Sequence, residues 1–266
     1  MMRTWQTRLS LDTGATALLD AYAALYGQAE RSLFAELAAG KKSKNDLKRE
    51  YQLRFGITAR QFNAIRIGLE GKVRSIQERR PDLIKELGQR VTRAKTVITK
   101  LRAIATGSPE QCAKRANKIH QKMRRLASLQ HRRSSMLQDQ KAGKIRLCFG
   151  SKKLFRAQLA LQENGYASHA AWLADWQTAR SGEFMAIGSK DETAGNQSCQ
   201  LRTTSKDGFA LKLRLPNAIG KTLEIPVTLP HGQQHLVDAL TLNQALTYRF
   251  VRDTTGWRAF CEIAGA

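Results

Sequence analysis

Hydrophobic and polar residues alternate at both ends of the chain, as they do in half-buried β-strands. Near the N-terminus, residues 3–11 place Trp5, Thr7, Leu9 and Leu11 on one face. After Gly182, turns with Gly, Asn or Pro separate six predicted strands, at residues 183–187, 198–202, 209–215, 222–228, 247–251 and 257–263. Six short strands in such a span predict a small antiparallel β-barrel. We expect the strand at 3–11 to join it.

Between these strands, hydrophobic residues recur at helical spacing. A first helix from Thr16 to Gly40, a short basic helix from Ser43 to Phe55 and a third helix from Thr58 to Ile76 are predicted. Two longer helices, at 82–105 and 110–138, form a hairpin about the turn at 107–109. A further helical pattern at 168–180 places Trp172 and Trp176 one turn apart, and we expect this pair to lie in the core.

The expected class is therefore α+β, an oligonucleotide-binding-type barrel with an inserted helical lobe. Residues 1–12 supply the first barrel strand, residues 13–140 the helical lobe, and residues 141–266 the rest of the barrel with short helices near 152–180.

Residues 143–156 suggest a site for phosphate. The alternation at 144–149 predicts a strand, residues 150–153 a tight turn, and the spacing from Leu154 a helix. Backbone N–H groups of Gly150 and Ser151, with the ammonium groups of Lys152 and Lys153, suit a phosphate group. Lys190 stands in a second Gly-Ser-Lys turn. The P-loop spacing is absent, and an ordinary basic strand–turn–helix is the alternative.

The charge favours a polyanionic partner. The chain has 45 Lys and Arg against 22 Asp and Glu, a net charge of +23, and residues 41–134 alone hold 26 basic and 7 acidic side chains. Nucleic acid is the leading partner class. Because the sequence lacks a long apolar run and an N-terminal signal, we expect no membrane partner and a cytoplasmic location, associated with the nucleoid when bound.

Two sets of basic and amide side chains are the candidate contacts. The third helix carries residues that can read base edges, with solvation as the alternative, and the DNA candidates are Arg60, Gln61, Asn63, Arg66, Lys72 and Arg74. The second hairpin arm is too basic for solubility alone. Its candidates for contact with a nucleic-acid backbone, which the resemblance given below assigns to RNA, are Lys114, Lys118, Lys122, Arg125 and Arg132, to which Gly150, Ser151, Lys152, Lys153 and Lys190 are added.

No catalytic or metal site is expected in the chain. Cysteines 112, 148, 199 and 261 lack zinc-ligand spacing, and free thiols in a reducing cytoplasm fit them. The five histidines are not placed with a nucleophile in a familiar pattern, and the acidic residues do not cluster as a two-metal site requires.

Several stretches together resemble the N-terminal half of TnpB proteins, which are transposon-encoded RNA-guided DNA nucleases, formerly OrfB transposases. They also resemble the compact type V CRISPR effectors. The likeness lies in residues 143–155 (GKIRLCFGSKKLF) and 184–196 (FMAIGSKDETAGN). Residues 60–65, 211–216, 248–250 and 256–258 support it. It covers nearly the whole chain, and the order and spacing of the segments carry it, not one diagnostic motif.

The resemblance implies a wedge-domain barrel interrupted by a recognition lobe, which together bind a guide RNA and a short DNA motif beside the double-stranded target. In that family a RuvC nuclease domain follows the barrel and holds divalent metal. Here the sequence stops after the strand at 257–263, so we expect no RuvC domain, no cofactor and no cleavage by this chain alone. A split gene with a separate RuvC-containing polypeptide, a nuclease-free repressor and a transposon remnant all fit this expectation.

An alternative from another class is a stand-alone basic RNA-binding or chaperone-like module that has no guide and no DNA target. Its charge pattern would be the same.

Overall fold

The computed structural model describes residues 3–40, 43–204, 208–229 and 231–263. The chain divides into two compact units. Met1–Glu70 and Cys148–Ala266 form the first, and Gly71–Leu147 form the second. The first two helices and the start of the third belong to the unit that holds the strands, whereas we expected a helical lobe from residue 13 to residue 140.

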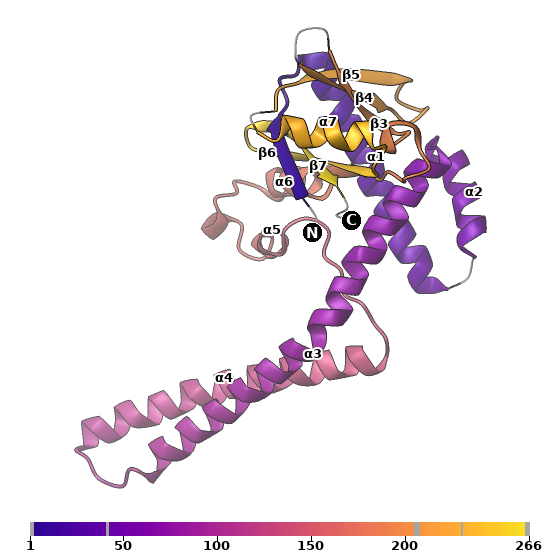
Figure 1. Cartoon of the computed structure of the whole chain (residues 1–266). Helices are drawn as coiled ribbons and strands as arrows, with labels where there is room; N and C mark the ends of the chain where they lie inside the picture. Colours follow the sequence, from indigo (N-terminus) through magenta and orange to yellow (C-terminus); the bar gives the residue numbers. More distant parts are fainter. Residues whose placement is uncertain (1–2, 41–42, 205–207, 230, 264–266) are drawn as a thin grey trace. The chain divides into compact units, whose positions relative to one another are not determined.

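A four-stranded antiparallel sheet joins the two ends of the chain. Its strand order is β1 (Arg3–Arg8), β7 (Gly256–Ile263), β6 (Leu246–Asp253) and β2 (Glu183–Ala186). Trp5 of β1 stands opposite Cys261 of β7, and Phe184 of β2 stands opposite Phe250 of β6. The prediction that the first strand joins the C-terminal strands is confirmed, and the helices between them are insertions in one sheet (Figure 1).

A second sheet has the order β3 (Cys199–Thr203), β4 (Phe209–Arg214) and β5 (Thr222–Val227). Alternation sorts its residues between two faces. Leu211 and Leu213 are buried, whereas Lys212 is half-buried and Arg214 is exposed. Tyr248 of β6 lies beside Cys199, so the two sheets share buried side chains.

The two sheets do not close into a barrel, which corrects that part of the expected fold. In the described residues no strand ladder joins them. Side-chain hydrogen bonds link them instead. The Thr7 hydroxyl, on β1, donates to the carbonyl of Thr228, one residue after β5, at 2.5 Å. The Asn196 side-chain amide makes a second link. It donates to the carbonyls of Ala186 on β2 and Leu246 on β6, and it accepts from the N–H of Cys199 on β3. The class is α+β with antiparallel sheets.

Helices cover the sheets of the first unit. α1 (Thr13–Ala39) begins where the Asp12 carboxylate accepts a hydrogen bond from the Ala15 N–H at 2.6 Å. It packs on the four-stranded sheet, where the rings of Tyr22 and Phe184 stack with centroids 4.3 Å apart. α2 (Lys44–Phe55) follows, and its Tyr51 ring packs against Phe62 of the third helix.

The remaining helices are short. They are α5 (Lys152–Ala157), the 3₁₀ turn η1 (Gln162–Asn164), α6 (His169–Arg180), the 3₁₀ turn η2 (Thr193–Gly195) and α7 (Gln233–Thr241). Trp172 and Trp176 are buried on α6, as predicted. α7 was not predicted, although Leu236 and Ala239 mark its buried side.

The second unit is a helical hairpin (Figure 1). α3 (Ala59–Ala103) enters it from the first unit, and α4 (Pro109–Lys141) returns, opened by a capping box between Ser108 and Gln111. Ile84, Leu87 and Ile98 of α3 and Leu129 of α4 are buried. The predicted break between residues 76 and 82 is wrong, because α3 runs without interruption through Pro81.

The strand predicted at 144–149 does not form. The backbone of Lys144 forms hydrogen bonds with a side chain and with the end of α4, and not with a neighbouring strand. The Lys144 carbonyl accepts a hydrogen bond from the Arg80 guanidinium at 2.7 Å, and its N–H donates to the Asp139 carbonyl at 2.8 Å. Arg146 holds the Asp139 carboxylate with two hydrogen bonds, at 2.5 and 2.9 Å.

Candidate nucleic-acid interface

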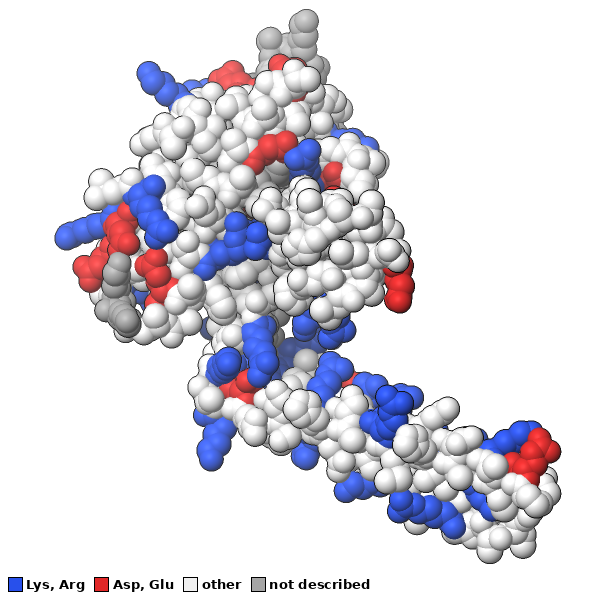
Figure 2. Space-filling view, turned by 180° about the vertical axis from the view of Figure 1, so that it is seen from behind, with Lys and Arg blue, Asp and Glu red and all other residues white. Residues whose placement is uncertain are grey.

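Positive charge is concentrated on the hairpin. Residues 71–147 contain 21 Lys and Arg and 5 Asp and Glu, so 16 cations remain after every carboxylate has neutralised one. Figure 2 shows Lys and Arg side chains along this hairpin, with few acidic side chains among them. Self-repulsion of this size favours a polyanionic partner.

The predicted RNA-contacting residues of α4 lie on its surface. Lys118, Arg125 and Arg132 are exposed, and Lys122 is half-buried. Lys114 is exposed too, and its ammonium forms an ion pair with Glu110 one turn away at 2.5 Å. Exposed pairs of this kind are weak, so Lys114 can exchange its carboxylate for a phosphate at little cost.

Gln61 does not lie where a base-reading residue must lie. Its side chain is 2% exposed. The Gln61 amide oxygen accepts from the Thr58 N–H at 2.9 Å, the Thr58 hydroxyl accepts from the Gln61 N–H at 3.2 Å, and the Gln61 amide nitrogen donates to the Arg214 carbonyl at 3.1 Å. This is a capping box that also ties α3 to β4. Its amide is occupied, which argues against the expected readout of DNA.

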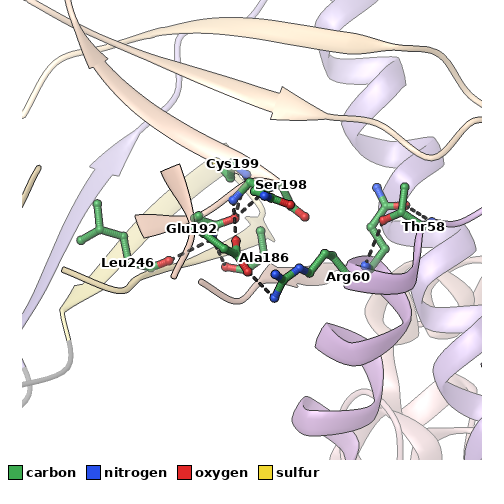
Figure 3. Close-up of polar contacts among 10 residues, drawn as sticks. Thr58, Arg60, Ala186, Glu192, Ser198, Cys199 and Leu246 are labelled. Atoms are coloured by element: carbon green, nitrogen blue, oxygen red, sulfur yellow. Dashed lines mark hydrogen bonds and ion pairs between the residues drawn. The ribbon is translucent and has the colours of Figure 1, made fainter. Parts of the chain in front are cut away.

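Arg60 forms an ion pair with a buried carboxylate. Its guanidinium forms an ion pair with Glu192, whose side chain is 1% exposed, while the Arg60 side chain itself is 45% exposed (Figure 3). The other Glu192 oxygen accepts from the Gln197 N–H at 2.6 Å. Arg60 is therefore held in place and still reaches solvent.

Beside this ion pair, Asn196 uses all of its hydrogen-bonding capacity in the core. Its amide nitrogen donates to the carbonyls of Ala186 and Leu246, both at 2.9 Å. Its amide oxygen accepts from the N–H groups of Ser198 and Cys199 at 2.8 and 3.0 Å (Figure 3). Asn196 is 0% exposed. The stretch 184–196 thus positions Arg60 and joins the sheets.

The other third-helix candidates divide between the two units. Arg66 is half-buried and forms an ion pair with Glu70 at 2.8 Å, which Lys44 also contacts at 3.0 Å. Burial tends to raise the pKa of the Glu70 carboxyl, but the hydrogen bonds from Lys44 and Arg66 outweigh it and hold that pKa below its ordinary value. Asn63 is half-buried.

Lys72 and Arg74 belong to the second unit. Lys72 is half-buried and has an interaction partner. The Arg74 side chain is 80% exposed and lies 3.7 Å from Glu78. The structure therefore does not gather the six DNA candidates into one surface of one unit.

The predicted phosphate-binding turn is exposed and basic. Gly150 adopts a positive φ of 82°, and the Ser151 hydroxyl accepts from the Leu154 N–H at 3.2 Å to start α5. Lys152 and Lys153 line a hollow of about 330 Å³ together with Arg156 and Asn164. Lys190, in the second Gly-Ser-Lys turn, is exposed, and its carbonyl accepts from the Asn243 amide at 3.1 Å.

A polar face of the three-stranded sheet was missed. Lys212, Arg214 and Lys221 line a hollow of about 560 Å³ with Gln197, Gln200, Asn217 and Thr222. Lys212 stands opposite Gln200 on β3 and Glu224 on β5. The alternation of residues 209–215 could have shown this face, since Lys212 and Arg214 occupy the positions between Leu211, Leu213 and Leu215.

Within the described ranges, no three His, Cys, Asp or Glu side chains are grouped to hold a metal ion. The helices in those ranges include none that is long and apolar enough to cross a membrane. No protein-family model matches the sequence, and no curated protein matches it significantly.

Proposed function

We propose that this chain binds a structured guide RNA and recognises a short DNA motif beside a double-stranded target, as part of a TnpB-like or type V CRISPR-like RNA-guided system. The observation that carries the proposal is the charge of the hairpin, where 21 basic side chains outnumber 5 acidic ones. Such a surface is neutralised most readily by phosphates, whose counterions are released on binding.

In this proposal each unit has its own part. The α3–α4 hairpin follows the backbone of RNA or of the guide–target heteroduplex, through Lys118, Lys122 and Arg125. The unit with the two sheets serves as the wedge domain. Its Lys152 and Lys153 hold phosphate, and Arg60 and Arg66 face the DNA motif. Divalent metal ions belong to a RuvC-type nuclease domain and not to the residues described here.

The layout of the chain supports this division. β1 pairs with β7, so the helical segments are inserted between strands of one sheet. An interrupted strand domain of this kind is what the resemblance to TnpB proteins implies. The charge and the layout are independent observations, since one rests on composition and the other on strand pairing.

Sequencing the RNA that co-purifies with the protein tests the proposal. One defined, structured RNA that ends in variable sequence is the expected result. A random mixture of cellular RNA would instead favour a stand-alone RNA-binding or chaperone-like module. The K118Q/K122Q/R125Q variant, purified in parallel, should retain less RNA than wild type.

A further inference from the structure

A hollow of about 510 Å³ is lined by residues of α1, α6 and β6 and the residue after α6, in the first unit. Three arginines that are distant in sequence line it, namely Arg31, Arg180 and Arg252. Asp20 is the acidic residue in its lining, and Ser181 adds a hydroxyl group. Three guanidinium groups around one carboxylate make the hollow positively charged.

The polypeptide is arranged to bring these arginines together. The Arg31 guanidinium donates to the Arg180 carbonyl at 3.1 Å, at the C-terminal end of α6. Gly27 of α1 permits this approach. A Cβ atom there would lie 2.8 Å from the Arg180 carbonyl oxygen and 3.0 Å from the Arg31 guanidinium. A larger residue at position 27 would push α6 away from α1.

The carboxylate in the hollow is already occupied. One Asp20 oxygen forms an ion pair with Arg252 at 2.7 Å, and the other accepts from the Trp257 indole N–H at 3.0 Å. Both Asp20 oxygens are therefore engaged, one with Arg252 and one with Trp257. Glu30, which is outside the lining, acts on the charge of Arg31 and has a partner of its own.

Arg31 and Arg180 repel each other, and part of Arg180 lacks a partner. Burial and the charge of Arg180 lower the pKa of Arg31, while Glu30 partly offsets them. The Arg180 Nε–H group is buried and has no hydrogen-bond partner among the described residues. Its guanidinium lies 5.5 Å from the centre of the Trp176 ring. Because Arg31 and Arg180 line the same hollow and repel each other, an anion bound there would stabilise both charges.

We propose that this hollow binds a phosphate group of the RNA backbone, with Arg31 and Arg180 as its donors. A planar guanidinium matches phosphate in two hydrogen bonds. The Gly150–Lys153 turn lies next to the hollow, because a Cβ atom on Gly150 would be 3.3 Å from the Ala179 carbonyl and from Arg180 Cγ. An RNA strand that crosses the C-terminal end of α6 would therefore contact both the hollow and the Gly150–Lys153 turn. This inference rests on the proposed function, since the phosphate belongs to the same RNA.

The test is the binding of a short fluorescein-labelled oligouridine, measured by anisotropy over a series of salt concentrations. The R31Q/R180Q variant should bind about tenfold more weakly than wild type, and its salt slope should be about 0.7 shallower for each phosphate that the variant no longer neutralises. The matched control is R54Q/R249Q, which removes two charges from arginines that pair with Glu36 and Glu183. Melting temperatures of both variants check that they are folded.

A second variant keeps the inference testable if R31Q/R180Q does not fold. D20N removes the negative charge of the hollow and keeps one amide oxygen to accept from the Trp257 indole N–H, which leaves Arg252 without its carboxylate. D20N should therefore bind oligouridine more tightly than wild type. A folded R31Q/R180Q variant that binds like the control overturns the inference, and so does D20N with wild-type affinity. Wild-type protein that ignores oligouridine overturns the proposed function as well, so the two failures are distinguishable.

Discussion

The guanidinium of Arg60 pairs with a Glu192 carboxylate that is 1% exposed, and this ion pair joins the first turn of α3 to the segment between β2 and β3. Removing the cation would leave the buried carboxylate charged and without a partner, which destabilises the folded state. The ion pair therefore makes the sequence at 184–196 and the start of α3 depend on each other.

We expect R60A to destabilise the protein by about 1–3 kcal/mol, and E192Q by less. R60A leaves a buried negative charge beside the Gln197 N–H, whereas E192Q removes the charge and keeps an oxygen for that N–H. Urea unfolding of the two single variants and the double variant measures the coupling. R74A, at an exposed arginine, is the control. A coupling of zero would contradict the account.

Asn196 should be among the most sensitive positions of the first unit. N196A leaves two carbonyl groups and two N–H groups unpaired in the core, and about 1–3 kcal/mol for each buried orphan group predicts a loss above about 3 kcal/mol. N217A, at an exposed asparagine, should stay within about 0.5 kcal/mol of wild type. Thermal and urea unfolding give both values, and similar losses for the two variants would show that Asn196 has no special part.

Gln61 and Arg66 should separate stability from recognition. Q61A should cost about 0.5–2 kcal/mol of stability through the lost cap and leave the preference for flanking DNA sequence unchanged.

R66A should relax the preference for flanking DNA sequence at one or two base pairs, by about 1–3 kcal/mol for each bidentate contact. Binding to a library of flanking sequences measures it. If R66A weakens binding equally on all sequences, Arg66 does not read bases.

The four thiols should differ in reactivity. Burial raises the pKa of Cys199 well above its ordinary value, and the nearby Cys261 raises it further. Burial also raises the pKa of Cys261 to about 12, against a lowering effect of the Tyr248 hydrogen bond. At a pH of about 8 a raised pKa leaves almost no thiolate, so both should resist a disulfide reagent until the protein unfolds. The half-buried Cys112 and Cys148 should react in the native state, and rapid reaction of all four would contradict the packing between the sheets.

Much of the fold could be predicted from local pattern. Alternation placed the ends of the strands after Gly182 within two residues, whereas the first strand, predicted to end at Leu11, ends at Arg8. The missing partner of the first strand predicted its pairing with the C-terminal sheet. Alternation failed at 144–149, because a strand needs a neighbouring strand and here Arg80 and Arg146 make the polar contacts. The predicted break before Asp82 failed because the Pro81 ring removes one N–H from a helix of 45 residues, which the rest of the helix tolerates.

The candidate site was less predictable, because burial is a property of the whole fold. Gln61 has the chemistry of a base-reading residue but stands at the third position after a Thr cap, where an amide also completes a capping box. The Arg31, Arg180 and Arg252 hollow had no sequence signal, since its members are 149 and 72 residues apart in the chain. The basic hairpin arm needed no such information, because an exposed helix keeps its charges on the surface.

The most direct test of the account is RNA binding by nucleic-acid-free protein at physiological ionic strength, followed over a salt series. We expect binding whose logarithm falls linearly with the logarithm of salt concentration. K118Q/K122Q/R125Q should lower the slope by up to about 2, at about 0.7 for each phosphate of a single strand that is no longer neutralised. The matched control K44Q/R54Q/R249Q, which removes three ion-paired cations, should change it less. Protein that does not bind RNA under these conditions would contradict the central claim.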